Sequence, residues 1–278
     1  MTKPTMTKIE AVILGSGSSG GVPRIGGPDG AGYWGDCDPA NPKNRRRRCS
    51  LLVRQTNDAG TTSVLVDTSP DMREQLIAAR TGALDAVLIS HDHADQLHGL
   101  DDLRMVAMNM RKRVDLYMDE GTYARILKRF DYCFLQAPGS DYPAILNAKM
   151  IAEPFEDFAV EGAGGALPVR TFWQEHGQIQ SLGFRFGPVA YSSDVNGLDD
   201  AAFAALEGVE CWIVDALRYA PHPSHAHVEQ ALEWIARVNP KRAVLTNLHV
   251  DLDYETLRKQ LPDGVEPAFD GMNLEFFV

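Results

Sequence analysis

The residues most able to do chemistry lie in one short segment, HDHAD at residues 91–95, which follows an apolar run. His98 comes three positions later, so that three histidines and two acids fall within eight positions. Imidazole nitrogens and carboxylate oxygens are ligands that zinc, manganese and iron accept. His91 and His93, two apart in an extended turn, can point to the same ion, while Asp95 can bind a neighbouring ion or hold an attacking water. The segment therefore predicts a divalent metal site.

Apolar runs along the chain must supply the strands that position these residues. Several of the runs end in polar or ionisable residues, as the one before the metal segment does. Between them, helical periodicity predicts helices over residues 71–79, 122–130 and 228–238. The pattern is therefore mixed α and β. The strand-like runs are IEAVILG, SVLVDT, AVLIS, VDLYMD, GFRFG, PVAYSSD, ECWIVDA and RAVLTNLH.

The organisation of the chain favours one domain over residues 1–278. No Ser/Gly-rich or Pro-rich linker divides it, and no internal repeat is evident. The irregular stretch from Gly20 to Asn44 is too long for a plain connection, and we expect a functional loop there.

Composition excludes several classes of protein. The 278 residues include 27 Lys and Arg against 38 Asp and Glu, a net charge of −11. This balance disfavours nonspecific nucleic-acid binding, although a small basic pocket for one phosphorylated ligand stays open. No apolar run approaches the roughly 18 residues of a membrane helix, so we expect no membrane contact. The start has no signal-like stretch and the four cysteines form no CxxC pair, which predicts a cytoplasmic protein with free thiols.

Two other motifs are weaker than they look. GSGSSG at residues 15–20 matches the dinucleotide pattern GxGxxG, but the glycines and prolines at residues 23–28 preclude the helix that must follow. A tight turn beside a crowded site is the better interpretation. The four arginines 45–48 resemble the entry to a strand, with alternate side chains on opposite faces. One of them could reach a substrate phosphate or a structural carboxylate.

A family resemblance covers nearly the whole chain. The motifs after its strands resemble those of metallo-β-lactamase-fold hydrolases. The opening turn, DDLR and PHPSH are most similar to PhnP-like cyclic phosphodiesterases, relatives of the tRNA 3′-processing endonucleases. The resemblance implies an α/β (α+β) fold, the four-layer αββα sandwich, with a metal site at one edge. The motifs are LGSGSSGGVPR, VLVDTSPDMREQL, SHDHADQLHGLDDLR, EHGQIQSLGFRFG, YSSDV, PHPSH and LTNLHVDLDY.

Family roles carry over to matching positions. By resemblance, one metal is held by three histidines, a second by Asp95 and a late histidine, and an aspartate bridges both. His225 matches the catalytic histidine, and Asp95 could also orient the nucleophile. Asp67 would orient the ligand loop by hydrogen bonds. The first three ligands are His91, His93 and His176, and the bridging residue is Asp194.

These roles have simpler alternatives. His176 could be an ordinary loop histidine, and Asp194 could form an Asx turn. Ser224 could cap the helix that follows it, with the nearby histidines exposed on the first turn.

The chain departs from the family pattern at two ligand positions. Gln96 stands where a histidine is usual, and His98 is the candidate replacement. Asn247 occupies the usual place of the late histidine, and His249, two residues on and so on the same face of a strand, is the natural substitute. The alternative is that Asn247 itself lines the site.

A structural zinc that relatives often carry is a third departure. Of the cysteine cluster in the first long loop only Cys37 remains, and Val250 stands where the partner histidine is expected. We predict that this zinc site is absent.

Together these residues predict a metal-dependent hydrolase with one or two divalent ions, zinc or manganese foremost and iron also open. A bridging water made acidic by two ions would attack a phosphodiester, and His225 would protonate the leaving oxygen. A small cyclic or nucleotide-like phosphodiester is the expected substrate, because no extended arm or basic surface for a long RNA is evident. Thioester or lactone hydrolysis, or a catalytically impaired metal-binding relative, are the alternatives, and a homodimer stays open.

Overall fold

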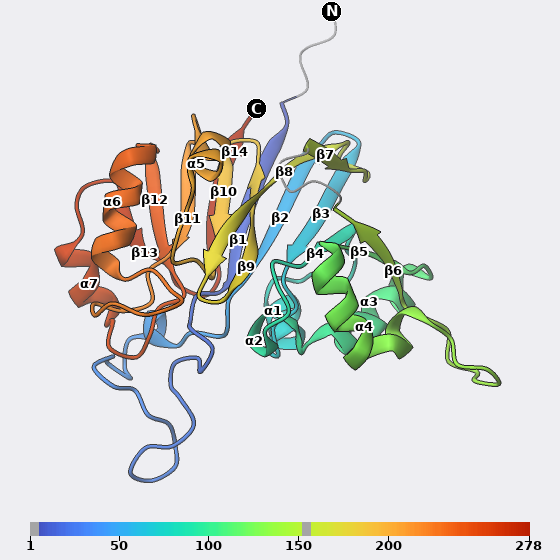
Figure 1. Cartoon of the computed structure of the whole chain (residues 1–278), viewed down its shortest axis with the longest axis horizontal. Coiled ribbons are helices and arrows are strands. Elements are labelled where there is room, and N and C mark those ends of the chain that lie inside the picture. Colours follow the sequence, from blue (N-terminus) through green and yellow to red (C-terminus); the bar gives the residue numbers. More distant parts are fainter. Residues whose placement is uncertain (1–5, 152–156) are drawn as a thin grey trace, which may run out of the picture. The chain divides into compact units, whose positions relative to one another are not determined.

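The computed structural model describes residues 6–151 and 157–278, and its described part forms two compact units. The first unit comprises the described residues of Met1–Val12, Ser50–Pro168 and Asn273–Val278, and the second comprises Ile13–Cys49 and Val169–Met272. Each unit contributes a β-sheet and helices, so the mixed composition predicted from the sequence is confirmed (Figure 1).

The sheet of the first unit brings two chemistry-bearing strand ends to one edge. Its strand order is β14-β1-β2-β3-β4-β5-β6, in which β2 and β3 are antiparallel and the strands from β3 to β6 are parallel. Parallel neighbours end at the same edge, so the residues after β3 and β4 lie side by side. The strands are β1 (Lys8–Gly15), β2 (Ser50–Asn57), β3 (Gly60–Val66), β4 (Ala86–Leu88), β5 (Val114–Met118), β6 (Leu146–Met150) and β14 (Met272–Phe277).

Helices of the first unit follow the parallel strands. They lie in the cyan and green part of the chain, near β4 and β5 (Figure 1). Helix α4 begins with a cap, since the Asp119 carboxylate accepts the Thr122 N–H at 2.9 Å. The helices are α1 (Met72–Ala78), α2 (Ala94–Leu97), α3 (Leu103–Met110) and α4 (Glu120–Phe134), with a 3₁₀ turn at Leu100–Asp102 and a further strand β7 (Asp157–Val160).

The second unit gathers four strand ends at one edge. Its strands follow the order β13-β12-β11-β10-β9-β8, with β10 to β13 parallel. Strand β9 is antiparallel to both β8 and β10, so β8 runs in the same direction as β10. The ends of β8, β10, β11 and β12 therefore share an edge. The strands are β8 (Leu167–His176), β9 (Ile179–Phe186), β10 (Val189–Ser192), β11 (Cys211–Asp215), β12 (Arg242–Thr246) and β13 (Val265–Pro267).

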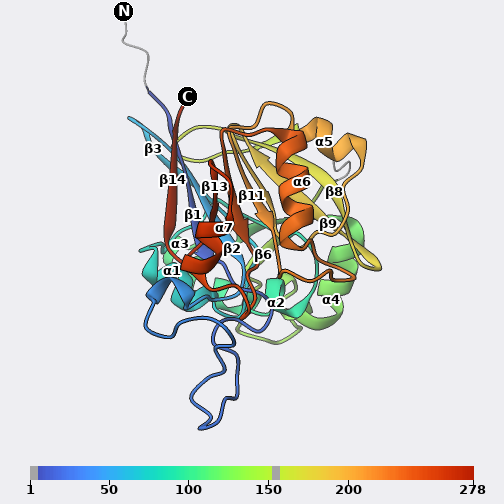
Figure 2. The same ribbon diagram turned by 90° about the vertical axis from the view of Figure 1, so that its left-hand side faces the viewer.

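Apolar helix faces cover this second sheet. Helix α6 (Val228–Val238) buries Ala231 and Ile235 against Trp212 of β11, in the core that α5 (Asp200–Leu206) and α7 (Tyr254–Gln260) share. Figure 2 shows α6 running alongside the strands of this sheet. The bounds predicted for this helix are confirmed. The helix predicted over residues 71–79 is α1, and the one predicted over 122–130 is longer, as α4.

The loop before β2 confirms that the four arginines form the entry to a strand. They come just before Ser50, where the strand begins, and Arg46 and Arg48 form isolated β-bridges. Arg46 is buried, and its guanidinium donates to the Leu252 carbonyl (2.7 Å) and the His249 carbonyl (3.2 Å). Arg47 pairs with the structural carboxylate of Asp270 at 3.0 Å. The Arg46 contacts tie the long first loop to the loop after β12, and the Arg47 ion pair ties it to the turn between β13 and β14.

The rest of that loop is irregular, as expected. No helix follows GSGSSG within the described residues before a 3₁₀ turn at Pro42–Asn44. Cys37 packs with Val22 and Val250 and donates its thiol to the Val250 carbonyl at 3.3 Å. All four cysteines are free and buried. Among the described helices, none has the length and apolarity of a membrane span.

Candidate functional site

In the first unit, a hydrogen-bonded chain of three residues fixes the ring of His91. Asp67 follows β3 with φ of 63°, and it accepts the Ser90 N–H at 2.7 Å and the Ser90 hydroxyl at 2.9 Å. The Ser90 oxygen lies 2.9 Å from Nδ1 of His91. Because the serine proton is given to Asp67, Nδ1 of His91 is the donor in this contact. The unprotonated nitrogen of the ring is therefore Nε2, the form in which histidine binds a metal.

The carboxyl group of Asp67 is fully buried, and burial raises its pKa to about 7 against the opposing hydrogen bonds from Ser90. A carboxylate held in this way is sensitive to charge, because a nearby cation favours its ionised form. The hydrogen bonds expected of Asp67 are present, and they are made to Ser90, the residue before His91.

His93 and Asp92 point to different surroundings. The rings of His91 and His93 lie 4.5 Å apart edge to face, and each offers a ligand nitrogen within 4.8 Å of the other. Asp92 instead forms ion pairs with Arg125, at 2.6 Å, and with Arg129 on α4. The Asp92 side chain is therefore held by α4. The ligand nitrogens that come close together in this segment are those of His91 and His93.

The three polar residues that follow differ in exposure. Asp95 is half-buried in the first turn of α2. Gln96 is fully buried, and its backbone carbonyl accepts the Thr68 N–H at 2.8 Å. His98 is exposed, with its ring 5.8 Å from that of Phe130.

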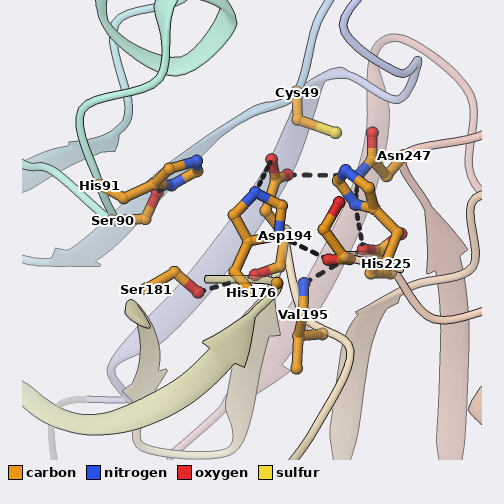
Figure 3. Close-up of polar contacts among 12 residues, drawn as sticks. Cys49, Ser90, His91, His176, Ser181, Asp194, Val195, His225 and Asn247 are labelled. Carbon is orange, nitrogen blue, oxygen red and sulfur yellow. Dashed lines mark hydrogen bonds and ion pairs between the residues drawn. The ribbon is translucent and has the colours of Figure 1, made fainter. Parts of the chain in front are cut away.

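In the second unit, the shared strand edge brings His176 next to Asp194 (Figure 3). His176 ends β8, and its Nδ1 donates to the Ser224 carbonyl at 2.6 Å, which makes Nε2 the unprotonated nitrogen. Nε2 lies 3.7 Å from a carboxylate oxygen of Asp194, beyond hydrogen-bond distance. Both side chains are buried.

A glycine permits the contact that orients His176. Gly177 has φ of 64°, and a Cβ there would lie 2.9 Å from Cβ of Ser224. Only glycine lets this turn approach the PHPSH segment so closely. On the other side, the Ser181 hydroxyl donates to the Asp194 carbonyl at 2.7 Å, which fixes the backbone at the second ligand position.

His225 is paired with an acid that the sequence reading did not single out. Its Nδ1 lies 2.8 Å from Oδ2 of Asp215, at the end of β11, and the Val195 N–H donates to the same oxygen at 3.1 Å. Burial raises the pKa of Asp215, and the neighbouring His225 opposes this. The available signal was the run WIVD, which ends in an acid as SVLVD does.

Asn247 directly follows the end of β12, and His249 does not lie on that strand. The strand ends at Thr246 and Asn247 has φ of 62°, so the expectation that His249 lies on the same strand face is wrong. The Asn247 amide donates to Asp194 at 3.2 Å and lies 3.1 Å from Nδ1 of His225. Nδ1 of His249 lies 2.6 Å from the Asp251 carboxylate.

A pocket of about 260 Å³ opens beside His225 within the second unit. It is rich in hydrogen-bond donors, and none of its lining residues carries a carboxylate. Burial, His225 and Arg218 all lower the pKa of His222, which favours the neutral imidazole. The lining residues are Ser18, Ser19, Arg24, Leu217, Arg218, His222, His225 and His249.

Comparison with known proteins identifies the fold. The model of the β-lactamase superfamily domain matches residues 62–247. A diphosphatase of the PhnP family has a crystal structure similar to this chain, with 31% identity and a TM-score of 0.84 over 98% of this chain and 99% of that one. Zn²⁺-bound PqqB from Methylobacterium extorquens shares the fold at 19% identity and a TM-score of 0.71, over 95% and 99% of the two chains. The αββα fold class predicted from the sequence is confirmed.

A curated relative is named for a different activity from that of the diphosphatase. The octanoyltransferase of Porphyromonas gingivalis is 31% identical over 270 residues, which are 95% of this chain. The match spans about half the length, 51%, of that relative.

Proposed function

Since this chain belongs to the β-lactamase superfamily, as a PhnP-like hydrolase of the metallo-β-lactamase fold, we propose that it is a metal-dependent phosphodiesterase acting on small phosphorylated molecules. The observation that supports this substrate class best is the pocket beside His225, which offers cationic and neutral donors and no carboxylate. Such a lining suits a phosphate group.

The ligand residues suit a divalent ion. Two ligands of a tetrahedral ion with bonds of about 2.1 Å lie about 3.4 Å apart. The 3.7 Å between Nε2 of His176 and the Asp194 carboxylate is close to this separation. By the family resemblance, His91 and His93 complete the site of the first ion with these two residues. Asp95 and His249 are the predicted protein ligands for a second ion, with Asp194 shared.

Bound divalent ions would supply Lewis-acid polarisation of the phosphoryl oxygens and lower the pKa of the attacking water. In hydrolysis, the water oxygen bonds to phosphorus, the bond from phosphorus to the leaving oxygen breaks, and that oxygen takes up a proton. His225 would donate it, because Asp215, 2.8 Å from its Nδ1, would stabilise the protonated imidazole and orient the ring. Asp95 would orient the water.

Hydrolysis of bis(p-nitrophenyl) phosphate tests the proposal. We expect turnover by protein supplied with zinc, manganese or iron, lost on chelation and in His93→Ala. His227→Ala is the matched control, because His227 is also a histidine of the chain but does not line the pocket. No turnover with any of the three metals would refute the phosphodiesterase. Turnover that survives chelation would refute the metal dependence, whereas its loss on chelation excludes the catalytically impaired relative.

Acyl hydrolysis is the second candidate, and the octanoyltransferase relative favours it. In that reaction the oxygen of the same water would bond to the thioester carbonyl carbon, the C–S bond would break, and the sulfur would leave as a thiol or thiolate. Hydrolysis of an octanoyl thioester by the same preparations, with no turnover of the phosphodiester, would select this candidate.

A further inference from the structure

We propose that a groove on the first unit binds a peptide segment of another protein, one that carries both large apolar and acidic residues. Helix α3, the end of α4 and the chain between α4 and β6 form this groove. None of its residues is among those assigned above to metal binding or catalysis. The proposal is therefore independent of the proposed hydrolysis.

The groove consists of two adjoining cavities in the first unit. One has a volume of about 380 Å³ and the other of about 330 Å³, and Pro143 lines both. Each volume falls within the range of about 300 to 1,000 Å³ that is usual for binding pockets. Figure 1 shows the chain between α4 and β6 extending beyond the end of α4. Because the two cavities share a wall, they form one elongated hollow, which suits a segment of chain with several side chains.

Large apolar side chains line the groove and are exposed to solvent. Tyr132, Leu135 and Tyr142 line the larger cavity, with exposed fractions of 48%, 60% and 77%. Met108 lines the smaller cavity and is 62% exposed. Exposed apolar side chains that gather along one hollow mark a protein-binding surface, and methionine and tyrosine are enriched in such surfaces. The partner should therefore bring large apolar side chains of its own.

Positive charges line the same groove. Arg111, Lys112 and Arg113 line the smaller cavity, and none of the three forms an ion pair with another residue that the structure describes. Arg104 lines the larger cavity and pairs with the exposed carboxylate of Asp101 at 2.7 Å. The lining of neither cavity includes an acid. In a chain of net charge −11, this local excess of cations is complementary to acidic side chains.

Backbone hydrogen bonds hold the walls of the groove in place. The Ile145 N–H donates to the Cys133 carbonyl at 2.8 Å, which fixes the returning chain against the end of α4. The Lys112 N–H donates to the Ala107 carbonyl at 3.2 Å, which fixes the basic segment against the last turn of α3. A groove that is formed before binding loses less conformational entropy when the partner binds.

A peptide segment of another protein fits this groove better than a second copy or a membrane. Two copies meeting groove to groove about a twofold axis would bring like charges together. Such a contact would also leave both hollows unfilled, and so would a flat lipid surface. An apolar and acidic segment fills the cavities and pairs with the cations.

Selection from a phage library of random twelve-residue peptides tests the groove. We expect the selected peptides to be enriched in Asp and Glu together with Leu, Phe, Trp or Tyr. Fluorescence anisotropy of a labelled copy of the most enriched peptide then gives the Kd for each variant. Leu135→Asp and Lys112→Glu should each raise this Kd by about tenfold or more. Ile77→Asp and Lys259→Glu are the matched controls, because both residues are exposed and line neither cavity, and they should leave the Kd within about twofold.

The contrary outcomes are distinct. A selection that yields no binder, peptides without an excess of acids, or an unchanged Kd in both groove variants would overturn the proposal. The Tm of each variant checks that the fold is kept, and Lys112→Glu alters only an exposed side chain. A dimer found by sedimentation and lost in Leu135→Asp would assign the groove to a second copy. Binding to anionic vesicles that is lost in the same variant would assign it to a membrane, and either of these two results would also overturn the proposal.

Discussion

Asp215→Asn should slow hydrolysis in a way that depends on the leaving group. Asp215 is fully buried, and its Oδ2 lies 2.8 Å from Nδ1 of His225. An asparagine there keeps the ring orientation, because the Val195 N–H at 3.1 Å requires an acceptor at the Oδ2 position. The substitution therefore removes the negative charge and leaves the tautomer of His225 unchanged.

The structure sets the size of the effect. Two unit charges about 4 Å apart interact by about 4 kcal/mol at an effective dielectric constant of about 20. Losing this stabilisation of the imidazolium corresponds to roughly 10³-fold, within the 10²- to 10⁴-fold that general acid catalysis supplies. We therefore expect kcat to fall by about 10²- to 10³-fold where the leaving oxygen needs a proton.

The assay compares two leaving groups. The ribose oxygen released from a 2′,3′-cyclic nucleotide needs a proton, whereas p-nitrophenolate leaves readily without one. Asp215→Asn should therefore lower kcat for the cyclic nucleotide by the full factor, but that for bis(p-nitrophenyl) phosphate by less than about tenfold. His227→Asn, in the same segment but outside the pocket lining, is the control. Equal losses on both substrates would refute the general-acid role of His225 and indicate a structural role for Asp215.

Three further outcomes follow from buried charges and from the metal. The raised pKa of Asp67 favours its neutral form in the folded state, so its stabilising contribution is complete below about pH 4 and is lost as the pH rises through 7. The test is urea unfolding in the presence of a chelator at pH 5 and pH 8. Between these values the free energy of unfolding should fall by roughly 3 kcal/mol more in the unaltered protein than in Asp67→Asn. An equal dependence on pH in the two proteins would contradict this. Arg46→Met should cost about 3 kcal/mol, because it removes charged hydrogen bonds to buried loop carbonyls, whereas exposed Arg45→Met should cost under about 1; similar urea midpoints would contradict this. Adding metal to chelated protein should raise its Tm, and a smaller rise in His93→Ala would confirm that this histidine is a ligand.

Periodicity and strand ends predicted much of the fold and part of the candidate site. The apolar face of α6 is encoded in consecutive turns, so its bounds could be read from the sequence. His176 and Asp194 lie at strand ends, and strands of one direction bring their ends to one edge. Local patterns were sufficient for these residues.

Tertiary contacts explain what the sequence did not predict. Asp215 becomes the partner of His225 through a loop that returns ten residues later, and no local pattern specifies that contact. The positive φ of Asn247 ends the alternation on which the placement of His249 relied. The pocket joins the Ser18 loop to residues two hundred positions away, so neither its volume nor its lack of carboxylates could be foreseen.

The proposed hydrolase depends on one metal ion with both His93 and His176 as ligands. The direct measurement is the metal content and affinity of the unaltered protein, His93→Ala, His176→Ala and the double variant, by equilibrium dialysis and elemental analysis. We expect that either substitution alone removes the same ion and that the double variant loses no more than the single ones. Losses that add, or full metal content in His176→Ala, would contradict it.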